Sequence, residues 1–274
     1  MYVSDNNYKI LEYIYSFIVA IGNYISTGKC IWCGRTIVNG ATFHNIPHVF
    51  PHALGGEDTC TDVCDECNHY FGTTKVHGVP SIDLTFKEIF NAYRFFCQNL
   101  NENSYKKLRS TFFSYHHSTH SIKIRQNFRN DILCRQLKRG LYECFLQKYH
   151  QVTGDGNNLI FDSVRQYARY NYGELRVYYA FNDIILAEKE QDRPHLGMSD
   201  ILLDAMREYG VYHFWLLGHS FYLEVFPIAF NVKGMAYLQN EAKHILLPTS
   251  DRVGIFEFND IRQIDPLMFR FNNR

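Results

Sequence analysis

The chain has no excess of either charge and no long apolar run. Its 28 Lys and Arg residues balance 28 Asp and Glu residues, so the overall composition does not indicate a polyanionic partner. The most apolar run, residues 14–25, is interrupted by Asn23 and falls short of the roughly 20 residues that cross a membrane. We find no export signal, internal repeat or low-complexity segment, and we expect a cytoplasmic protein without a membrane segment.

The residues that are present favour a packed globular fold. The chain is 46% hydrophobic and contains 22 Phe and 20 Tyr residues, a composition that argues against disorder. Its 274 residues can bury one good core and a smaller module. Eight cysteines in a chain without an export signal indicate a reducing compartment, in which thiolates remain available to bind metal.

The hydrophobic periodicities predict an α+β protein in four parts. These parts are an N-terminal helix (1–28), a cysteine module (29–80), a helical and basic segment (81–158) and a mixed α+β C-terminal domain of unknown role (159–274). We expect helices over 8–26, from Asp65 to before Gly78, over 84–100, from Asn130 to about Tyr149, and over 159–171 and 199–209. We expect a hairpin within 108–128 and strands over 175–187, 212–218, 220–230 and 253–258. The N-terminal helix or the C-terminal domain offers a surface for a homo-oligomer.

The charges are unevenly distributed along the chain. Residues 105–139 carry nine basic residues and one acidic residue, Asp131. A polyanionic partner is the simplest functional reason for such a block, and a solvated hairpin and helix face is the alternative. The last three basic residues lie off the apolar line of the predicted helix, so we expect them to face solvent or a ligand. The residues predicted to bind nucleic acid are Lys106, Lys107, Arg109, Lys123, Arg125, Arg135, Lys138 and Arg139.

The segment from Cys30 to Gly72 contains the most informative pattern. Two Cys-x-x-Cys pairs, formed by Cys30, Cys33, Cys64 and Cys67, supply the four soft ligands that zinc prefers in a structural site. A His-x-x-Pro-x-x-x-Gly-Gly run lies between the pairs. It begins at His48 and ends at Gly55 and Gly56, which we expect to serve the backbone geometry of a loop. Asn68 follows the fourth cysteine directly.

This order of CxxCG, HxxPxxxGG and VCxxCN resembles the HNH endonucleases, in the branch where four cysteines staple the ββα-metal fold. The resemblance implies a metal-dependent endonuclease that hydrolyses phosphodiester bonds of DNA, with structural Zn²⁺ and a catalytic divalent cation such as Mg²⁺. By position in the motif, His48 is the general base that activates water, and Asn68 coordinates or orients the catalytic cation. Standalone proteins of this kind resemble nucleases of phage defence and of mobile elements.

The chain departs from the family pattern beside the general base. Many members have an acidic metal ligand immediately before that histidine, whereas this chain has Pro47. The middle Asn of the motif is not evident, with Thr61 or Asp62 near its expected position. Candidate replacement ligands are His44, His52, Asp62 and His69. Two alternatives therefore stay open: a non-catalytic, zinc-dependent nucleic-acid-binding module, and an RNA-cleaving HNH nuclease.

Overall fold

The computed structural model describes residues 25–74, 76–101, 107–116, 118, 121–180, 196–216, 219–244 and 255–264. The predicted helix over 8–26 lies outside the described residues except for Ile25 and Ser26, which are not helical. None of the described helices is both long enough and apolar enough to cross a membrane.

Helices and strands are mixed along the chain, which confirms the predicted α+β class. The α-helices are α2 (Asp65–Gly72), α3 (Ile82–Asn101), α4 (Asn130–Thr153), α5 (Asp162–Ala168), α7 (Asp200–Tyr209), α8 (Pro227–Ala229) and α9 (Met235–His244). The strands are β1 (Phe113–His116), β2 (Ser121–Ile124), β3 (Val177–Ala180), β4 (Val211–Leu216), β5 (His219–Glu224) and β6 (Ile255–Glu257). Short helical turns are η1 (Ile37–Asn39), η2 (His52–Leu54), η3 (Leu159–Phe161), the π-helical η4 (Phe230–Gly234) and η5 (Ile261–Gln263).

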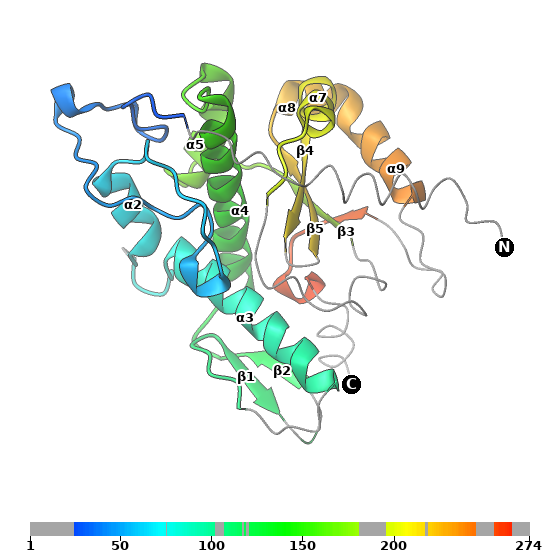
Figure 1. The fold of residues 1–274 in the computed structure, drawn as a ribbon. Coiled ribbons are helices and arrows are strands. Elements are labelled where there is room, and N and C mark those ends of the chain that lie inside the picture. Colours follow the sequence, from blue (N-terminus) through cyan, green and yellow to red (C-terminus); the bar gives the residue numbers. More distant parts are fainter. Residues whose placement is uncertain are drawn as a thin grey trace.

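Helix α4 lies at the centre of the molecule, between the cysteine module with α2 on one side and the larger sheet on the other (Figure 1). Its residues from Leu133 to Gln151 are almost all buried. Leu137, Leu141 and Phe145, which the sequence places at intervals of four, all belong to the main hydrophobic cluster. The helix ends at Gly154, whose left-handed conformation (φ 72°) closes the last turn through a hydrogen bond from its N–H to His150 O.

The described residues also form two antiparallel sheets. Strands β1 and β2 form the predicted hairpin, with Phe113 paired to Ile124. The larger sheet has the order β4-β5-β3-β6, and Tyr179 of β3 packs against Phe221 of β5 in its interior. The Tyr142 hydroxyl of α4 donates to the backbone carbonyls of Arg176 (2.8 Å) and Glu224 (3.0 Å), which ties α4 to this sheet.

The cysteine module is also tied to α4, through a buried network around Asp62. Its carboxylate accepts hydrogen bonds from Ser26, from Thr27 and Gly28, and from His150 Nε2 of α4 at 2.7 Å. Burial alone would raise the pKa of Asp62, but the hydrogen bonds from Thr27 and His150 bring it below its usual value. Lys148 of α4 adds an ion pair to Asp58 at 2.6 Å.

The strand predicted over 220–230 is wrong beyond Glu224. Pro227 begins α8 and is followed by η4 and α9, which the sequence analysis missed. A proline suits the first position of a helix because it has no N–H to leave unsatisfied and its φ is already helical. The apolar residues of 225–230 are therefore divided between the end of a strand and the start of a helix.

Candidate metal centre and active-site cleft

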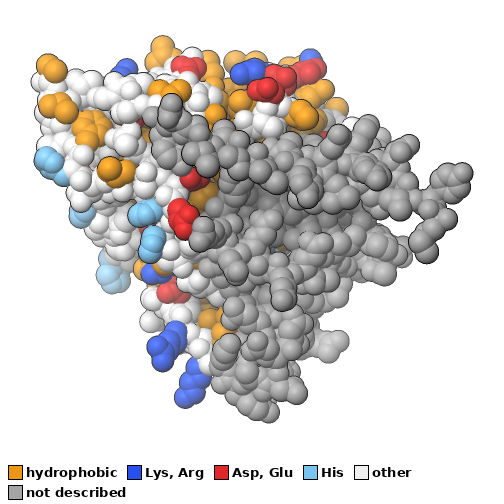
Figure 2. All heavy atoms as spheres, viewed as in Figure 1, with side chains coloured by type: hydrophobic (Ala, Val, Ile, Leu, Met, Phe, Trp, Pro, Cys, Tyr) orange, Lys and Arg blue, Asp and Glu red, His pale blue; other side chains and the backbone are white. Residues whose placement is uncertain are grey.

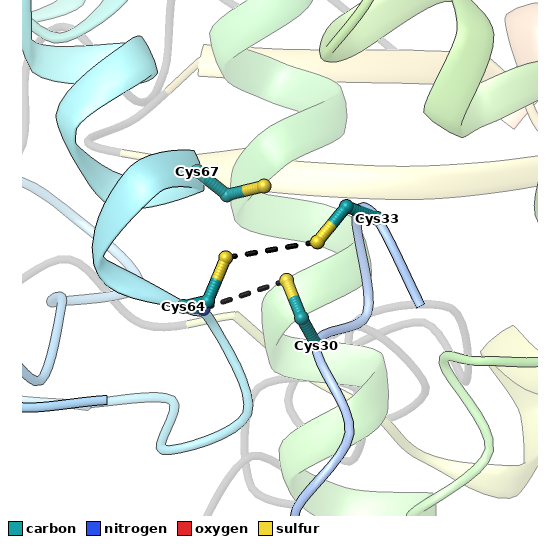
Figure 3. Close-up of side chains that lie close together, drawn as sticks. All are labelled: Cys30, Cys33, Cys64 and Cys67. Atoms are coloured by element: carbon teal, nitrogen blue, oxygen red, sulfur yellow. Dashed lines mark hydrogen bonds between the residues drawn. The ribbon is translucent and has the colours of Figure 1, made fainter. Parts of the chain in front are cut away.

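The four cysteines of the two Cys-x-x-Cys pairs converge, as predicted. Their sulfur atoms all lie within 4.8 Å of one another, and Cys33 Sγ is 3.6 Å from Cys64 Sγ (Figure 3). Zn–S bonds of about 2.3 Å place tetrahedral sulfurs about 3.8 Å apart, so the cluster fits a zinc ion with little adjustment. Cys60 is buried nearby but does not belong to the cluster.

Local structure explains why the cysteines meet. The Gly34 N–H donates to Cys30 O and forms the first turn, while Cys64 lies at the N-terminus of α2 and Cys67 lies in its first turn. A hydrogen bond from Cys67 lowers the pKa of the Cys30 thiol to about 5, and as the donor of that bond Cys67 has a raised pKa. A bound metal would take the place of these shared protons, because zinc binds thiolates.

Two arginines compensate the negative charge of the cluster. Arg35 Nε donates to Cys33 Sγ, and Arg169 Nε donates to Cys67 Sγ, both at 3.4 Å. Arg169 is mostly buried and stacks over the ring of Tyr70, with its guanidinium carbon 3.9 Å from the ring centroid. Because Arg169 follows α5, the zinc knuckle is connected to a part of the chain far away in sequence, which sequence reasoning could not foresee.

His48 lies on a short antiparallel ladder. It pairs with Thr59 between two hydrogen bonds, from Val49 N–H to Asp58 O (2.7 Å) and from Cys60 N–H to Pro47 O (3.0 Å). Pro47 and Val49 are buried while His48 is exposed, as expected for alternating residues of a strand. The ladder therefore anchors the backbone and directs the imidazole outward.

The two glycines of the motif serve backbone geometry. Gly55 has φ 89°, in the left-handed region that glycine favours, and ends the η2 turn that contains His52. Gly56 lies so close to Phe50 that a Cβ atom would overlap the Phe50 carbonyl oxygen. These constraints keep the loop between the two strands tight against the core.

A cleft of about 340 Å³ opens beside His48. His48, His52 and Asn68 all line it, and the two imidazole ring centroids are 5.3 Å apart. Among the described residues, neither the His48 ring nor the side-chain amide of Asn68 has a hydrogen-bond partner, so both remain available to a ligand. Histidine side chains gather over this part of the surface (Figure 2).

The other two candidate histidines do not line the cleft. His44 is exposed, and its backbone N–H is held by the Asp65 carboxylate at 3.1 Å. His69 is exposed on α2, with its ring beside the Thr73 hydroxyl. Asp62 is 1% exposed and fully engaged in its hydrogen-bond network. Of the replacement ligands considered from the sequence, His52 alone lies at the cleft.

Two carboxylates that the sequence analysis did not consider also line the cleft: Asp83 of α3 and Glu143 of α4. Burial raises the pKa of Asp83 to about 6. Burial, and next the negative charge of Asp83, raise the pKa of Glu143 well above its usual value. The sequence contains one signal that could have identified Glu143: this charged residue lies between Tyr142 and Cys144 inside a predicted helix.

The predicted basic interface divides into two halves. The first half is exposed in or beside the β1–β2 hairpin and consists of Lys107, Arg109, Lys123 and Arg125. Lys106 lies outside the described residues. Arg125 also holds the hairpin, because its Nε donates to Phe113 O at 3.1 Å.

The second half of the basic block makes contacts within the protein, and the prediction that it faces solvent or a ligand is wrong for Lys138 and Arg139. Arg139 is 3% exposed and donates to Ala168 O, Gln136 Oε1 and Tyr70 Oη. Lys138 is 8% exposed and donates to Asn259 Oδ1 at 2.9 Å. Arg135 donates to Asn171 Oδ1 and to Gly173 O and forms an ion pair with Glu174. Lys138 and Arg139 are buried because α4 is covered along most of its length, whereas the Arg135 side chain is 29% exposed and makes its contacts at the surface.

Residues 30–77 match the family model described as HNH endonuclease. The chain therefore contains a segment of the HNH endonuclease family, with the four-cysteine cluster as its zinc knuckle, and the resemblance seen in the sequence is confirmed. The match of this segment supports nuclease activity in general. The comparisons with the curated proteins and with the solved structures found no match for the chain.

Proposed function

We propose that this protein is a metal-dependent endonuclease that hydrolyses phosphodiester bonds of DNA, with His48 as the general base. The observation that carries the proposal is the exposed imidazole of His48, without a protein hydrogen-bond partner among the described residues, in a cleft shared with Asn68. A general base must reach a water molecule, and the ladder fixes the backbone from which this side chain projects into the cleft.

The chemistry of the cleft suits this role. His48 Nδ1 or Nε2 accepts a proton from the attacking water, and the ladder fixes the backbone position from which the ring projects. Asn68 offers an amide oxygen, and the cleft adds two carboxylates, so the donor set fits a hard divalent cation such as Mg²⁺. When bound, such a cation supplies Lewis acidity to a phosphate oxygen.

The proposed DNA contact runs from the cleft toward the β1–β2 hairpin. Glu88 of α3 fixes the start of the hairpin, because its carboxylate accepts hydrogen bonds from Thr111 N–H (2.9 Å) and Thr111 Oγ1 (3.1 Å). On the face shown in Figure 2, Lys and Arg side chains lie at the hairpin end, below the histidines. Exposed cations at this place would bind backbone phosphates and position the duplex without reading its sequence.

Plasmid cleavage with Mg²⁺ or Mn²⁺ tests the proposal. We expect His48→Ala to lower the rate of strand cleavage by about 100-fold or more, the usual contribution of a general base. His44→Ala is the matched control, because His44 is also exposed but does not line the cleft. Cleavage that survives His48→Ala would overturn the mechanism.

The same assay separates the alternatives. Binding of duplex DNA without cleavage under any divalent cation would indicate a non-catalytic zinc module. Preferential cleavage of single-stranded or structured RNA over duplex DNA would indicate an RNA nuclease. A role in phage defence or in a mobile element follows from the resemblance, and expression of the wild type and of His48→Ala in phage-challenged bacteria would test it.

A further inference from the structure

The cleft beside His48 is completed by two helices that lie outside the family segment. Asp83 lies in the first turn of α3, and Glu143 lies in the middle of α4. The helices approach closely at Gly140, where a Cβ atom would come within 2.7 Å of the Phe86 ring. This approach brings Asp83, next to Ile82, and Glu143, one turn after Gly140, to the same cleft.

The two carboxylates are only partly compensated by positive charge: Arg139 acts on Glu143, but its guanidinium donates to Ala168 O, Gln136 Oε1 and Tyr70 Oη instead. Among the described residues, no Lys, Arg or His side chain is paired with either of them. Glu143 is 8% exposed, and its Oε1 accepts one hydrogen bond, from Gln147 Nε2 at 3.1 Å. Burial of neighbouring carboxylates without a paired counterion costs free energy, and a bound cation would offset that cost.

Pro47 leaves a gap in the family's ligand set that these residues can fill. Its side chain has no donor atom, and it is buried beneath the ladder of His48. The cleft nevertheless contains two carboxylates and the side-chain amide of Asn68. This side-chain amide has no hydrogen-bond partner among the described residues. Oxygen donors of this kind are those that Mg²⁺ and Mn²⁺ prefer.

We propose that Asp83 and Glu143 bind the divalent cation of this cleft, in place of the acidic residue that Pro47 replaces, with Asn68 as a further ligand. The catalytic use of the cation rests on the proposed nuclease function, whereas its binding does not. The metal site would then be assembled from the family segment and from two helices that follow it in the chain.

Mn²⁺ binding to the full-length, zinc-loaded protein tests the proposal without reference to activity. We expect Asp83→Asn and Glu143→Gln each to weaken Mn²⁺ binding more than about tenfold, measured by titration calorimetry and by the electron paramagnetic resonance signal of free Mn²⁺. Asp204→Asn is the control, because Asp204 is an exposed carboxylate of α7 paired to Arg207. His48→Ala should bind Mn²⁺ as the wild type does.

Thermal unfolding verifies that the variants are folded. Mn²⁺ should raise the Tm of the wild type, since a ligand that binds the native state stabilises it, and should not raise that of the Asp83→Asn, Glu143→Gln double variant. Without Mn²⁺, the isosteric double variant should unfold at or above the wild-type Tm. A double variant that binds Mn²⁺ with wild-type affinity would overturn the proposal.

The two proposals fail in different ways. If the carboxylate variants lose Mn²⁺ binding while the wild type cleaves no substrate, the metal site is supported and the nuclease function is refuted. If these variants keep Mn²⁺ binding while His48→Ala abolishes cleavage, the nuclease function is supported and the ligand assignment is refuted.

Discussion

Gly140 is the residue on which the geometry of the cleft depends most directly. It lies inside α4, where glycine is less favourable than alanine by about 1 kcal/mol. The structure explains why it is there, because Phe86 and Ile82 of α3 occupy the space that a side chain would need. The close helix pair in turn brings Asp83 and Glu143 to one cleft.

We expect Gly140→Ala to destabilise the protein by about 1–2 kcal/mol, because the overlap with the buried Phe86 ring outweighs the gain in helix propensity. Urea unfolding at neutral pH measures the change. Phe86→Leu should relieve the overlap, so the double variant should be more stable than the sum of the two single effects predicts. An equally or more stable Gly140→Ala variant would show that α3 can shift without cost.

Two arginines of the basic block differ in their surroundings although their side chains are the same. Arg109 and Arg139 belong to one basic block in the sequence, yet the first is exposed and the second is buried among backbone and side-chain acceptors. Burial lowers the pKa of Arg139. Charge along the sequence therefore identified a basic segment but not which of its residues could meet a ligand.

At the scale of elements, the β1–β2 hairpin is the part of the basic block that remains open to a partner. It is attached to α3 through Glu88, and α3 also carries Asp83. A phosphate contact on the hairpin would therefore be held rigidly relative to the cleft.

We expect an Arg109→Glu, Lys123→Glu double variant to weaken duplex DNA binding about equally for all sequences and to reduce its salt dependence. The charge-matched control is Arg207→Glu, Lys233→Glu, on the exposed surface of α7 and η4. Fluorescence anisotropy at several salt concentrations measures both. Equal losses for the two double variants would mean that net charge, and not the hairpin, determines binding.

At the scale of the whole molecule, the HNH segment and the rest of the chain share one core. The main hydrophobic cluster extends from Cys30 to Ile264 and includes residues of α2, α3, α4 and the larger sheet. The Asp62–His150 and Asp58–Lys148 pairs add polar ties between the segment and α4. The four-part division remains a prediction, but its second and third parts are packed together.

We therefore expect residues 29–80 with zinc not to fold as an isolated fragment, because removal of α4 would expose the apolar surface that it covers and leave Asp62 without His150. Amide resonances of the fragment and of the full chain provide the comparison. The full chain should unfold in a single transition. Native-like dispersion of the fragment's resonances would show that the family segment is autonomous.

The sequence by itself determined the local chemistry of this protein. The spacing of the cysteines, the His48 motif and the two glycines specify a zinc knuckle and a tight loop, because these depend on residues close together in the chain. Apolar periodicity likewise predicted α3, α4 and the β1–β2 hairpin.

Only the tertiary structure decided what surrounds that chemistry. Helix α4 is buried along most of its length, so its Lys138 and Arg139 are enclosed and its Glu143 lines one cleft with Asp83 and His48. Such a meeting depends on the crossing of helices far apart in sequence, and no local pattern encodes it. The position proposed for the general base is therefore predicted by the motif, whereas the carboxylates proposed to replace a ligand at Pro47 are brought together only by packing.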